Sequence, residues 1–352
     1  MSSPGSARAP LVAEAGERAL IERIRQRVPA ADRALVVGIG DDAAVAASDR
    51  GALQVLTTDA LVEGVHFDRR FSTPADIGYK ALAVNVSDVA SMGGTPRFAL
   101  LSLMLPESVA IQEVDGLIDG LLTIAAQTRV TLAGGNITRS PGPLIVDVSV
   151  VGSVKPRRIL TRGGGRPGDA IYVTGWVGAA AAGLGWLRRE GEVRSSAAGG
   201  VVADPDDAGL AECVERYRRP EPRARVGALL GRSRAATACM DLSDGLADAV
   251  AQISSASGTG AAIDASLVPL HPASRAWFAR TGQDPIAAAI AGGDDYELLF
   301  AVSQRRRGRL RGVIHQGRGV SITRIGELTA NTAVGLVREG RLEPLPSGFV
   351  HF

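Results

Sequence analysis

The chain has 352 residues, more than one hydrophobic core usually serves, so its length predicts two domains. Apolar residues make up 45% and charged residues 22%, as in an ordinary globular chain, and a net charge of +2 gives no sign of a nucleic-acid-binding surface. No apolar run approaches the roughly 18 residues of a membrane span. We therefore expect neither a nucleic acid nor a membrane as a partner. Cys213 and Cys239 are too few and too isolated for a disulfide framework or a zinc knuckle, which predicts a reducing, cytoplasmic location.

The first part of the chain predicts alternating helices and strands behind a short tail. Residues 1–14 begin with MSSPGSARAP, which is small, polar and rich in turn formers, and they predict a disordered tail without a signal peptide. A helix starting at Pro74 has the best-marked ends, because Thr73 can cap it, proline suits its first position and Gly93-Gly94 stop it. The other elements expected here are a helix over 16–27, strands over 34–46, 52–59 and 98–105, a helix over 109–128, and strands over 130–134 and 144–154.

The segment KPRRILTRGGGRPGD, residues 155–169, is rich in Gly, Pro and Arg and predicts a domain boundary. We expect an N-terminal domain at 15–154 and a C-terminal domain at 155–352. In the second domain, TACMDLSDGLADAVAQISSASG predicts strand, loop and helix, AAAIAGGDDYELLFAV predicts helix, loop and strand, and residues 190–207 predict a loop. The run RRRGRLR at 305–311 is either a basic patch or a solvated face. The whole pattern predicts an α+β fold with mixed helix and sheet layers.

One glycine-containing loop looks like a nucleotide-binding motif. VVGIGDDAAV, residues 36–45, satisfies the loose G-x-G-x-x-G/A pattern of a dinucleotide-binding turn. However, Asp41 and Asp42 would repel a pyrophosphate there, and a further strand follows in place of the required helix. A P-loop is also excluded, because neither Lys80 nor Lys155 follows a glycine. Phosphate near Asp42 therefore requires an intervening metal ion.

Acidic residues gather where predicted strands end. They are Asp42, the run Thr57-Thr58-Asp59, Asp241, Asp244 and the pair Asp294-Asp295, while Asp88 lies on the helix that begins at Pro74. Any one of them could be a turn former or a helix cap. Their number is better explained if strand ends bring the carboxylates to one rim, where cations must separate them. Carboxylate and hydroxyl oxygens suit Mg²⁺, and no Cys/His set exists for zinc, so the pattern indicates Mg²⁺-dependent nucleotide chemistry.

Eight segments together resemble the thiamine-monophosphate kinase family, within the superfamily of aminoimidazole ribonucleotide synthetase and selenophosphate synthetase. They are GIGDDAAV, TTDALVEGVHF, YKALAVNVSDVASMGG, GGNITR, ILTRGGGRPGD, MDLSDGLADA, GGDDYELLF and the terminal GFVHF. The resemblance implies the two-domain fold of that superfamily, with the N-terminal domain pairing its strands across a homodimer. It also implies transfer of the γ-phosphoryl group of ATP to thiamine monophosphate (TMP), giving thiamine diphosphate, in the cleft between the domains.

The resemblance also implies roles for individual residues. Magnesium ligands would be Asp42, Thr57, Thr58, Asp59, Asp88, Asn136, Asp241 and Asp244, and contacts to ATP would come from Gly135, Asn136, Arg162 and Ser243. His66, Asp294 and Phe349 would meet TMP, and Asp59, Asp88, Asp244 and Arg162 would act in catalysis. The sequence departs from the family at Asn136, where Asp is usual, and at Asp294, where Glu is usual.

The implied reaction suits these residues, since a phosphate monoester oxygen is already anionic near neutral pH. No Ser, Cys or general-base His is needed, and catalysis reduces to positioning and charge neutralisation. Two alternatives remain. One is a sister ATP-dependent synthetase or ligase of the superfamily, although no Cys precedes Cys213 as a selenophosphate synthetase would require. The other is a non-catalytic nucleotide-sensing homologue, which only Asn136 favours.

Overall fold

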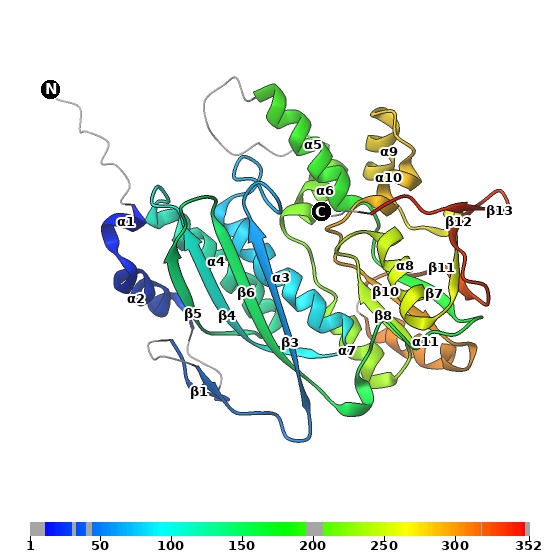
Figure 1. The fold of residues 1–352 in the computed structure, drawn as a ribbon, viewed down its shortest axis with the longest axis horizontal. Coiled ribbons are helices and arrows are strands. Elements are labelled where there is room, and N and C mark those ends of the chain that lie inside the picture. The colour runs from blue at the N-terminus through cyan, green and yellow to red at the C-terminus, as the bar shows by residue number, and fades with distance from the viewer. Residues whose placement is uncertain (1–10, 30–32, 40–43, 195–206, 318, 349–352) are drawn as a thin grey trace.

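The structure is a computed structural model that describes residues 11–29, 33–39, 44–194, 207–317 and 319–348. The elements before residue 155 are α1 (Val12–Ala15), α2 (Glu17–Arg27), β1 (Leu35–Val37), β2 (Val45–Ala46), β3 (Leu53–Val62), α3 (Pro74–Ser91), β4 (Thr95–Leu105), α4 (Ile111–Thr128), β5 (Thr131–Arg139) and β6 (Ile145–Val154). Strands β3-β6-β4-β5 form a four-stranded sheet in that order. Helices α3 and α4 cover one of its faces (Figure 1).

The elements after residue 155 build a second, larger sheet. Its strands and the helices around it are η1 (Pro156–Arg158), β7 (Ala170–Thr174), α5 (Ala179–Arg194), α6 (Ala208–Arg218), α7 (Ala224–Ser233), β8 (Ala238–Asp241), α8 (Leu246–Ser257), β9 (Gly260–Asp264), η2 (Ala265–Leu267), α9 (Pro272–Arg280), α10 (Pro285–Ala291), β10 (Leu298–Val302), η3 (Gln304–Arg306), α11 (Arg307–Gln316), β11 (Ile322–Thr329), β12 (Val334–Arg338) and β13 (Arg341–Pro344). The strand order is β13-β12-β9-β11-β7-β10-β8. The two sheets lie beside each other along the long axis of the molecule (Figure 1).

Strand β10 shows how helices cover both faces of the larger sheet. Leu298, Phe300 and Val302 pack into a core with residues of α7 and α11. The alternate residues Leu299 and Ala301 pack into a second core with residues of α5 and α8. Because successive side chains of a strand point to opposite faces, a strand that is buried throughout reads as a continuous apolar run. The sequence LLFAV is such a run.

Helix α3 has the ends that the sequence predicts. Thr73 and Asp76 form a capping box: the Asp76 amide donates to Thr73 Oγ1 at 3.2 Å, and the Thr73 amide donates to Asp76 Oδ2 at 2.9 Å. Pro74 occupies the first turn, and Gly93 follows the helix with φ +69°. The helix crosses α4 very closely, since a Cβ on Gly78 would lie 1.8 Å from the Leu117 carbonyl oxygen. This close packing fixes α3 between the sheets, where it also contacts β3, α7 and β8.

Several other expectations need correction or extension. The strand expected over 34–46 is two short antiparallel strands, β1 and β2, although no helix follows the glycine-containing loop, as predicted. Strand β5 continues to Arg139, so GGNITR lies within a strand. Helix α5 continues to Arg194 into the expected loop at 190–207, of which 195–206 lie outside the described residues. Residues 12–14 of the expected tail belong to α1, and Val12 is buried. Among the helices that the structure describes, none is long and apolar enough to cross a membrane.

Candidate active site

Four of the predicted aspartates come together between the two sheets. We call Asp59 on β3, Asp88 on α3, Asp241 at the end of β8 and Asp244 in the following loop the carboxylate cluster. Thr57 Oγ1 donates to Asp88 Oδ2 at 2.5 Å, which joins β3 to α3. Ser87 Oγ donates to Asp241 Oδ2 at 2.7 Å, which joins α3 to β8. The buried position of α3 therefore gathers carboxylates that lie far apart in the sequence.

Burial raises the pKa values of three members of the cluster, and for Asp59 and Asp241 the charge of Asp88 adds to the effect. Burial, followed by the charge of Asp88 and a side-chain hydrogen bond to it, raises the pKa of Asp59 to about 6. Burial also raises the pKa of Asp88, against the opposing effects of hydrogen bonds from Thr57 and Asp59 and of the Arg162 charge. The pKa of Asp241 is raised by burial and then by the charge of Asp88. The metal-free cluster is thus short of positive charge at neutral pH.

The donor set of the cluster fits a hard cation. It offers only carboxylate and hydroxyl oxygens, the ligands that Mg²⁺ prefers. Across the described ranges, no three carboxylate, imidazole or thiol groups are arranged to hold one ion by themselves. Magnesium usually keeps several waters and takes only one or two carboxylates together with substrate phosphates, so the cluster does not need such an arrangement. Asp42, the remaining predicted carboxylate ligand, lies outside the described residues.

Arg162 and Ser243 border the cluster. Arg162 is exposed, its guanidinium donates to the Gln252 side chain, and its charge acts on Asp88. Ser243 Oγ lies 3.4 Å from Asp244 Oδ2. An exposed guanidinium near the carboxylates can reach a phosphate that a cation holds there.

Three other predicted residues lie on the opposite face of the four-stranded sheet. Thr57 and Asp59 face α3, so Thr58 between them faces away, and its Oγ1 lies 2.9 Å from both Asp147 Oδ1 and Ser149 Oγ. Gly135 and Asn136 on β5 line a cavity of about 970 Å³ on this open face, together with Asp147 and Ser149. Gly135 also has a packing role, because a Cβ there would lie 1.9 Å from the Leu101 carbonyl oxygen. The structure therefore does not bring Thr58, Gly135 and Asn136 to the carboxylate cluster.

The loop that carries Asp294 is hydrogen-bonded to the loop that carries Asp244. The Asp294 amide donates to the Ser243 carbonyl at 2.8 Å, and the Tyr296 amide donates to the Leu242 carbonyl at 3.0 Å. Asp294 has φ +68° and Tyr296 has φ +49°, so both adopt the left-handed conformation. Aspartate tolerates this conformation better than most residues, which suits the family departure at this position. Burial first, and then the charges of Asp294 and of three members of the cluster, raise the pKa of Tyr296.

Lys80 links two residues that were predicted to meet the substrate. Its Nζ lies 3.2 Å from Asp294 Oδ1 and donates to the His66 carbonyl at 3.4 Å. The Lys80 ammonium also lies over the Tyr217 ring, 4.3 Å from its centroid, and only 4% of the Lys80 side chain is exposed. His66 Nδ1 accepts the Val62 amide at 3.1 Å. We call Lys80, Asp294, His66 and Tyr217 the lysine cluster. Phe349, the third predicted substrate contact, lies outside the described residues.

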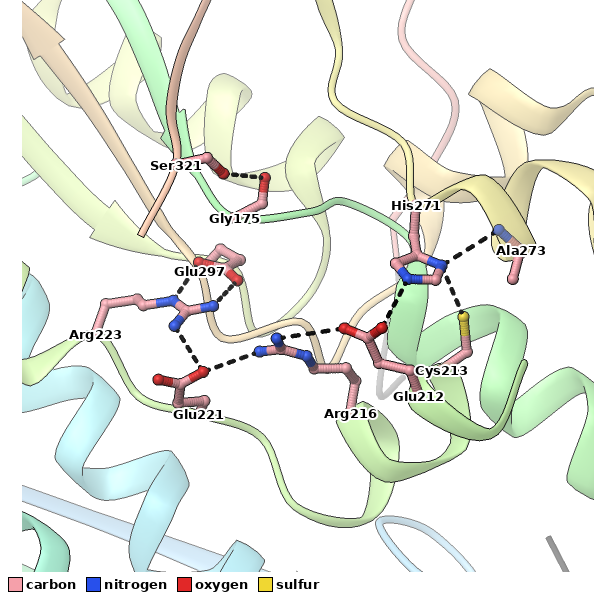
Figure 2. A network of polar contacts seen from close by, with 10 residues as sticks. All are labelled: Gly175, Glu212, Cys213, Arg216, Glu221, Arg223, His271, Ala273, Glu297 and Ser321. Atoms are coloured by element: carbon pink, nitrogen blue, oxygen red, sulfur yellow. Dashed lines mark hydrogen bonds and ion pairs between the residues drawn. The ribbon is translucent and has the colours of Figure 1, made fainter. Parts of the chain in front are cut away.

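The two acidic residues that flank Tyr296 hold this loop in place. Asp295 accepts the amides of Gly178 at 2.6 Å and Ala180 at 3.1 Å, so it caps the start of α5. Glu297 forms a two-point ion pair with Arg223, at 2.6 Å to Nε and 2.5 Å to the terminal nitrogen, and both side chains are almost fully buried. Figure 2 shows this pair at one end of a chain of polar contacts that continues through Glu221, Arg216 and Glu212 to His271.

The far end of that chain resembles a nucleophile site but is not one. Cys213 Sγ lies 3.4 Å from His271 Nδ1, and His271 Nε2 lies 3.3 Å from Glu212 (Figure 2). However, His271 Nδ1 also accepts the Ala273 amide at 3.3 Å, as the cap of α9. Burial raises the pKa of the Cys213 thiol to about 12, which leaves almost no thiolate at neutral pH. This contact is therefore structural.

Sequence reasoning missed several residues of the site: Ser87, Asp147, Ser149, Lys80, Tyr217 and Tyr296. Three of them carried a signal. Asp147 and Ser149 interrupt the apolar strand sequence IVDVSVV with a period of two, which marks one polar face. Lys80 is one of only two lysines and lies in an otherwise apolar stretch of α3. The partners of these residues, in contrast, come from distant segments that no local pattern identifies.

Comparison with known proteins places these features in a family. The family models "AIR synthase related protein, N-terminal domain" and "AIR synthase related protein, C-terminal domain" match residues 40–154 and 166–338. The thiamine-monophosphate kinase of Escherichia coli (strain K12) is 37% identical over 96% of this chain and 98% of its own.

Two solved structures extend the likeness to the fold. The thiamine-monophosphate kinase of Stenotrophomonas maltophilia K279a has 34% identity and a TM-score of 0.78, covering 92% of this chain and 96% of its own. AaThiL complexed with AMPPCP and TMP has 31% identity and a TM-score of 0.74, covering 96% of this chain and 98% of its own. With its two-domain fold, the chain therefore belongs to the thiamine-monophosphate kinase family.

Proposed function

We propose that this protein phosphorylates thiamine monophosphate to thiamine diphosphate with ATP, by direct, in-line, Mg²⁺-assisted transfer and without a P-loop. The observation that carries the proposal is likeness over nearly the whole chain to kinases of that name, at 37% identity in Escherichia coli. AaThiL, whose fold is shared, was solved with AMPPCP, an ATP analogue, and TMP. The carboxylate cluster supplies the oxygen ligands that such a transfer requires.

We assign the magnesium site to the carboxylate cluster together with Thr57. Bound there, Mg²⁺ would neutralise the negative charge of the phosphate oxygens while the γ-phosphoryl group passes in line from ATP to a phosphate oxygen of TMP. Thr57 and Ser87 orient the carboxylates of Asp88 and Asp241 through their hydrogen bonds. Arg162 would offer a planar fork of donors to the phosphates of ATP. The acceptor is already an anion, so no side chain has to remove a proton from it.

We assign the acceptor side of the site to the lysine cluster. Lys80 carries a buried positive charge that Asp294 compensates, and the same ammonium holds the carbonyl of His66. This arrangement fixes the loop before β10 against the segment after β3. Because Asp294 also lies beside Ser243, the same loop connects the acceptor side to the carboxylate cluster.

Asp294→Asn is expected to raise the KM for TMP about tenfold while changing the KM for ATP less than about twofold. Loss of one charged hydrogen-bonding partner costs on the order of 1.5–3 kcal/mol. Asparagine tolerates the left-handed conformation of this position, so the substitution tests charge and leaves the backbone in place. Steady-state kinetics with each substrate varied in turn measures both constants. Equal increases in the two KM values would contradict the assignment of Asp294 to the acceptor side and would instead indicate a role beside the metal site.

Asn136→Asp tests for a second ion, on the face of the four-stranded sheet opposite the carboxylate cluster, and is expected to lower the Mg²⁺ concentration for half-maximal rate by about 3- to 10-fold at fixed ATP and pH. An amide oxygen is a neutral and weaker ligand than a carboxylate, so the ion near this position should bind less tightly than with Asp. Asn136 lines the same cavity as Asp147, which would supply charge on that face. The product should not change. A higher Mg²⁺ requirement, or a folded but inactive enzyme, would show that Asn136 faces something other than a metal ion.

We also propose that the protein is a homodimer that pairs through the open face of the four-stranded sheet. Leu56 and Leu100 are 69% and 40% exposed there: Leu100 lies in the same cross-strand row as Ser149 and Thr58, and Leu56 precedes Thr58 by two residues on β3 and so points to the same face. Val36 on β1 and Val45 on β2 are also exposed. Such a patch on a sheet face is costly in water and favours association.

The double variant Leu56→Asp/Leu100→Asp is expected to be monomeric by light scattering after size exclusion, where the wild type is dimeric. Leu267→Asp is the matched control, since that leucine is 45% exposed on η2, which belongs to the second part of the chain and not to the four-stranded sheet. A monomeric wild type, or a double variant that stays dimeric, would contradict this pairing.

A product assay tests the proposed activity. Purified protein is incubated with ATP, Mg²⁺ and TMP, and thiamine diphosphate is measured by chromatography against a reaction without TMP. We expect thiamine diphosphate to accumulate in step with ADP. A protein that binds ATP without forming product would favour the nucleotide-sensing alternative.

We place the activity in the cytoplasm, since Cys213 and Cys239 are both free and buried, as in a reducing compartment.

A further inference from the structure

A second polar cavity lies away from the residues assigned to the kinase site. It has a volume of about 610 Å³ and lies where the end of β6, the short helix η1 and helix α7 meet. None of the residues predicted to bind metal, ATP or TMP lines it. Its wall includes Gly93, just after α3, and Leu229 of α7, so it spans the junction between the two parts of the chain.

Five cationic side chains surround this cavity, and we call it the basic cavity. They are Arg50, Lys155, Arg158, Arg225 and Arg232. Arg50 and Lys155 come from the segments that border β3 and β6, whereas Arg225 and Arg232 come from α7. The one acidic residue in the wall is Asp49, which accepts the Ser153 hydroxyl at 2.7 Å and lies 3.7 Å from Arg97. Positive charge therefore exceeds negative charge around the cavity.

These five cations are not neutralised by carboxylates in the described part of the chain. Three of them are held by neutral oxygens instead: Lys155 donates to the Arg50 carbonyl at 2.7 Å, Arg225 Nε to the Gln316 carbonyl at 2.9 Å, and Arg232 to the Gln316 side chain at 2.7 Å. A single residue at the end of α11 thus orients two guanidinium groups. Elsewhere on the surface, Arg27 and Arg338 each form two ion pairs with acids. Repulsion among the five cations is left for a bound anion to relieve.

We propose that the basic cavity binds a compact oligophosphate, that is, a chain of two or three phosphoryl groups, free or carried by a nucleotide. Guanidinium forks match the geometry of phosphate oxygens, and an oligophosphate brings several negative charges into a small volume. A nucleic acid would instead require cations spread along a stripe. Here the cations surround one hollow, and the basic run at 305–311 does not line it. The bound anion joins cations from both parts of the chain.

The test uses inorganic tripolyphosphate as the probe, without Mg²⁺ and at low ionic strength. Binding to the full-length protein is measured by calorimetry and by the rise in melting temperature, since a ligand of the native state stabilises it. We expect Arg158→Glu/Arg232→Glu to weaken binding at least tenfold. The control Arg305→Glu/Arg311→Glu, with the same charge change on exposed arginines outside the cavity, should bind within about twofold of the wild type. Wild-type affinity should fall as salt is added.

Two further measurements keep the proposal falsifiable. Arg158→Gln/Arg232→Gln removes two positive charges without introducing negative ones. Its affinity for tripolyphosphate should lie between those of the wild type and the Glu variant, and it serves as the test if the Glu variant does not fold. Arg162→Ala should leave tripolyphosphate binding unchanged, because Arg162 borders the kinase site. Loss of binding in Arg162→Ala, or unchanged binding in both cavity variants, would overturn the proposal. Tighter binding of a ten-nucleotide single strand than of tripolyphosphate would also overturn it, in favour of a nucleic-acid surface.

Discussion

Asp59→Asn and Asp88→Asn are each expected to lower kcat by at least about 100-fold and, in the absence of metal, to make the folded protein more stable at pH 8. Both effects have one cause, which is the shortage of positive charge in the carboxylate cluster. Each substitution removes a charge that Mg²⁺ needs but that the metal-free fold holds at a cost. If the aspartate had a purely structural role, its replacement would instead lower the stability of the protein.

The sign of the stability change follows from the pKa of Asp59. Its folded-state pKa, about 6, is raised above the unfolded value of about 4, so the folded state binds the proton more tightly. The ionised form therefore destabilises the fold fully above pH 6, and this penalty disappears towards pH 4. The gain from Asp59→Asn should be on the order of 1–3 kcal/mol at pH 8 and close to zero at pH 4.

Urea denaturation in EDTA at the two pH values measures this gain, and kinetics with Mg²⁺ measures kcat. Asp284→Asn is the matched control, for which we expect a change in stability of the opposite sign. A hydrogen bond from Arg338 lowers the pKa of Asp284, so its replacement should reduce stability slightly and leave kcat unchanged. Added Mg²⁺ should stabilise the wild type more than either cluster variant. Wild-type kcat in both cluster variants, or lower metal-free stability in both at pH 8, would contradict a metal-binding cluster.

Glu297→Gln is expected to lower the free energy of unfolding by about 3–5 kcal/mol, because it leaves the buried Arg223 without its two-point partner. Only 6% of the Arg223 side chain and 4% of the Glu297 side chain are exposed, so water cannot replace the lost contacts. Glu297 also accepts the Thr174 hydroxyl at 2.5 Å. The loop before it holds Asp294 and Tyr296 in the left-handed conformation, which requires firm support.

Glu221→Gln provides the comparison for Glu297→Gln. Glu221 pairs with the same arginine at 2.9 Å, but its side chain is 59% exposed, and exposed pairs contribute at most about 1 kcal/mol. Urea denaturation at pH 7.5 should therefore separate the two variants clearly. If Glu297→Gln loses less than about 1 kcal/mol, the buried pair does not anchor the loop.

The parts of this structure that could be predicted from sequence depend on local signals. The ends of α3 follow from Thr73, Pro74 and Gly93, because capping, proline geometry and a left-handed glycine act within a few residues. Asp241 ends β8 as the sequence predicts, but β3 continues to Val62, so Asp59 does not end its strand and reaches the cluster from the face of β3 that packs against α3. Residues 34–46 misled the strand prediction because two short strands with a loop between them have the same apolar content as one longer strand.

Other parts could not be predicted because they depend on long-range geometry. Thr58 sits between two residues that face the cluster, but the alternation of a strand turns it to the opposite face, beside Asp147. Lys80 meets Asp294 across 214 residues of sequence (294 − 80 = 214), and Arg223 meets Glu297 across 74. No periodicity or motif encodes such pairs. The first pair arises once α3 has packed against the larger sheet, and the second once the segment before α7 has packed against the loop before β10.

The proposed function requires that the γ-phosphoryl group of ATP passes directly to TMP. The most direct measurement uses ATP labelled with ³²P at the γ-position, with Mg²⁺ and TMP, and follows the label through one chromatographic separation. We expect the label to enter thiamine diphosphate in a one-to-one ratio with the ADP formed. When TMP is left out, we expect the label to stay in ATP. Release of the label as inorganic phosphate, with none in thiamine diphosphate, would contradict direct transfer and favour the chemistry of a sister synthetase.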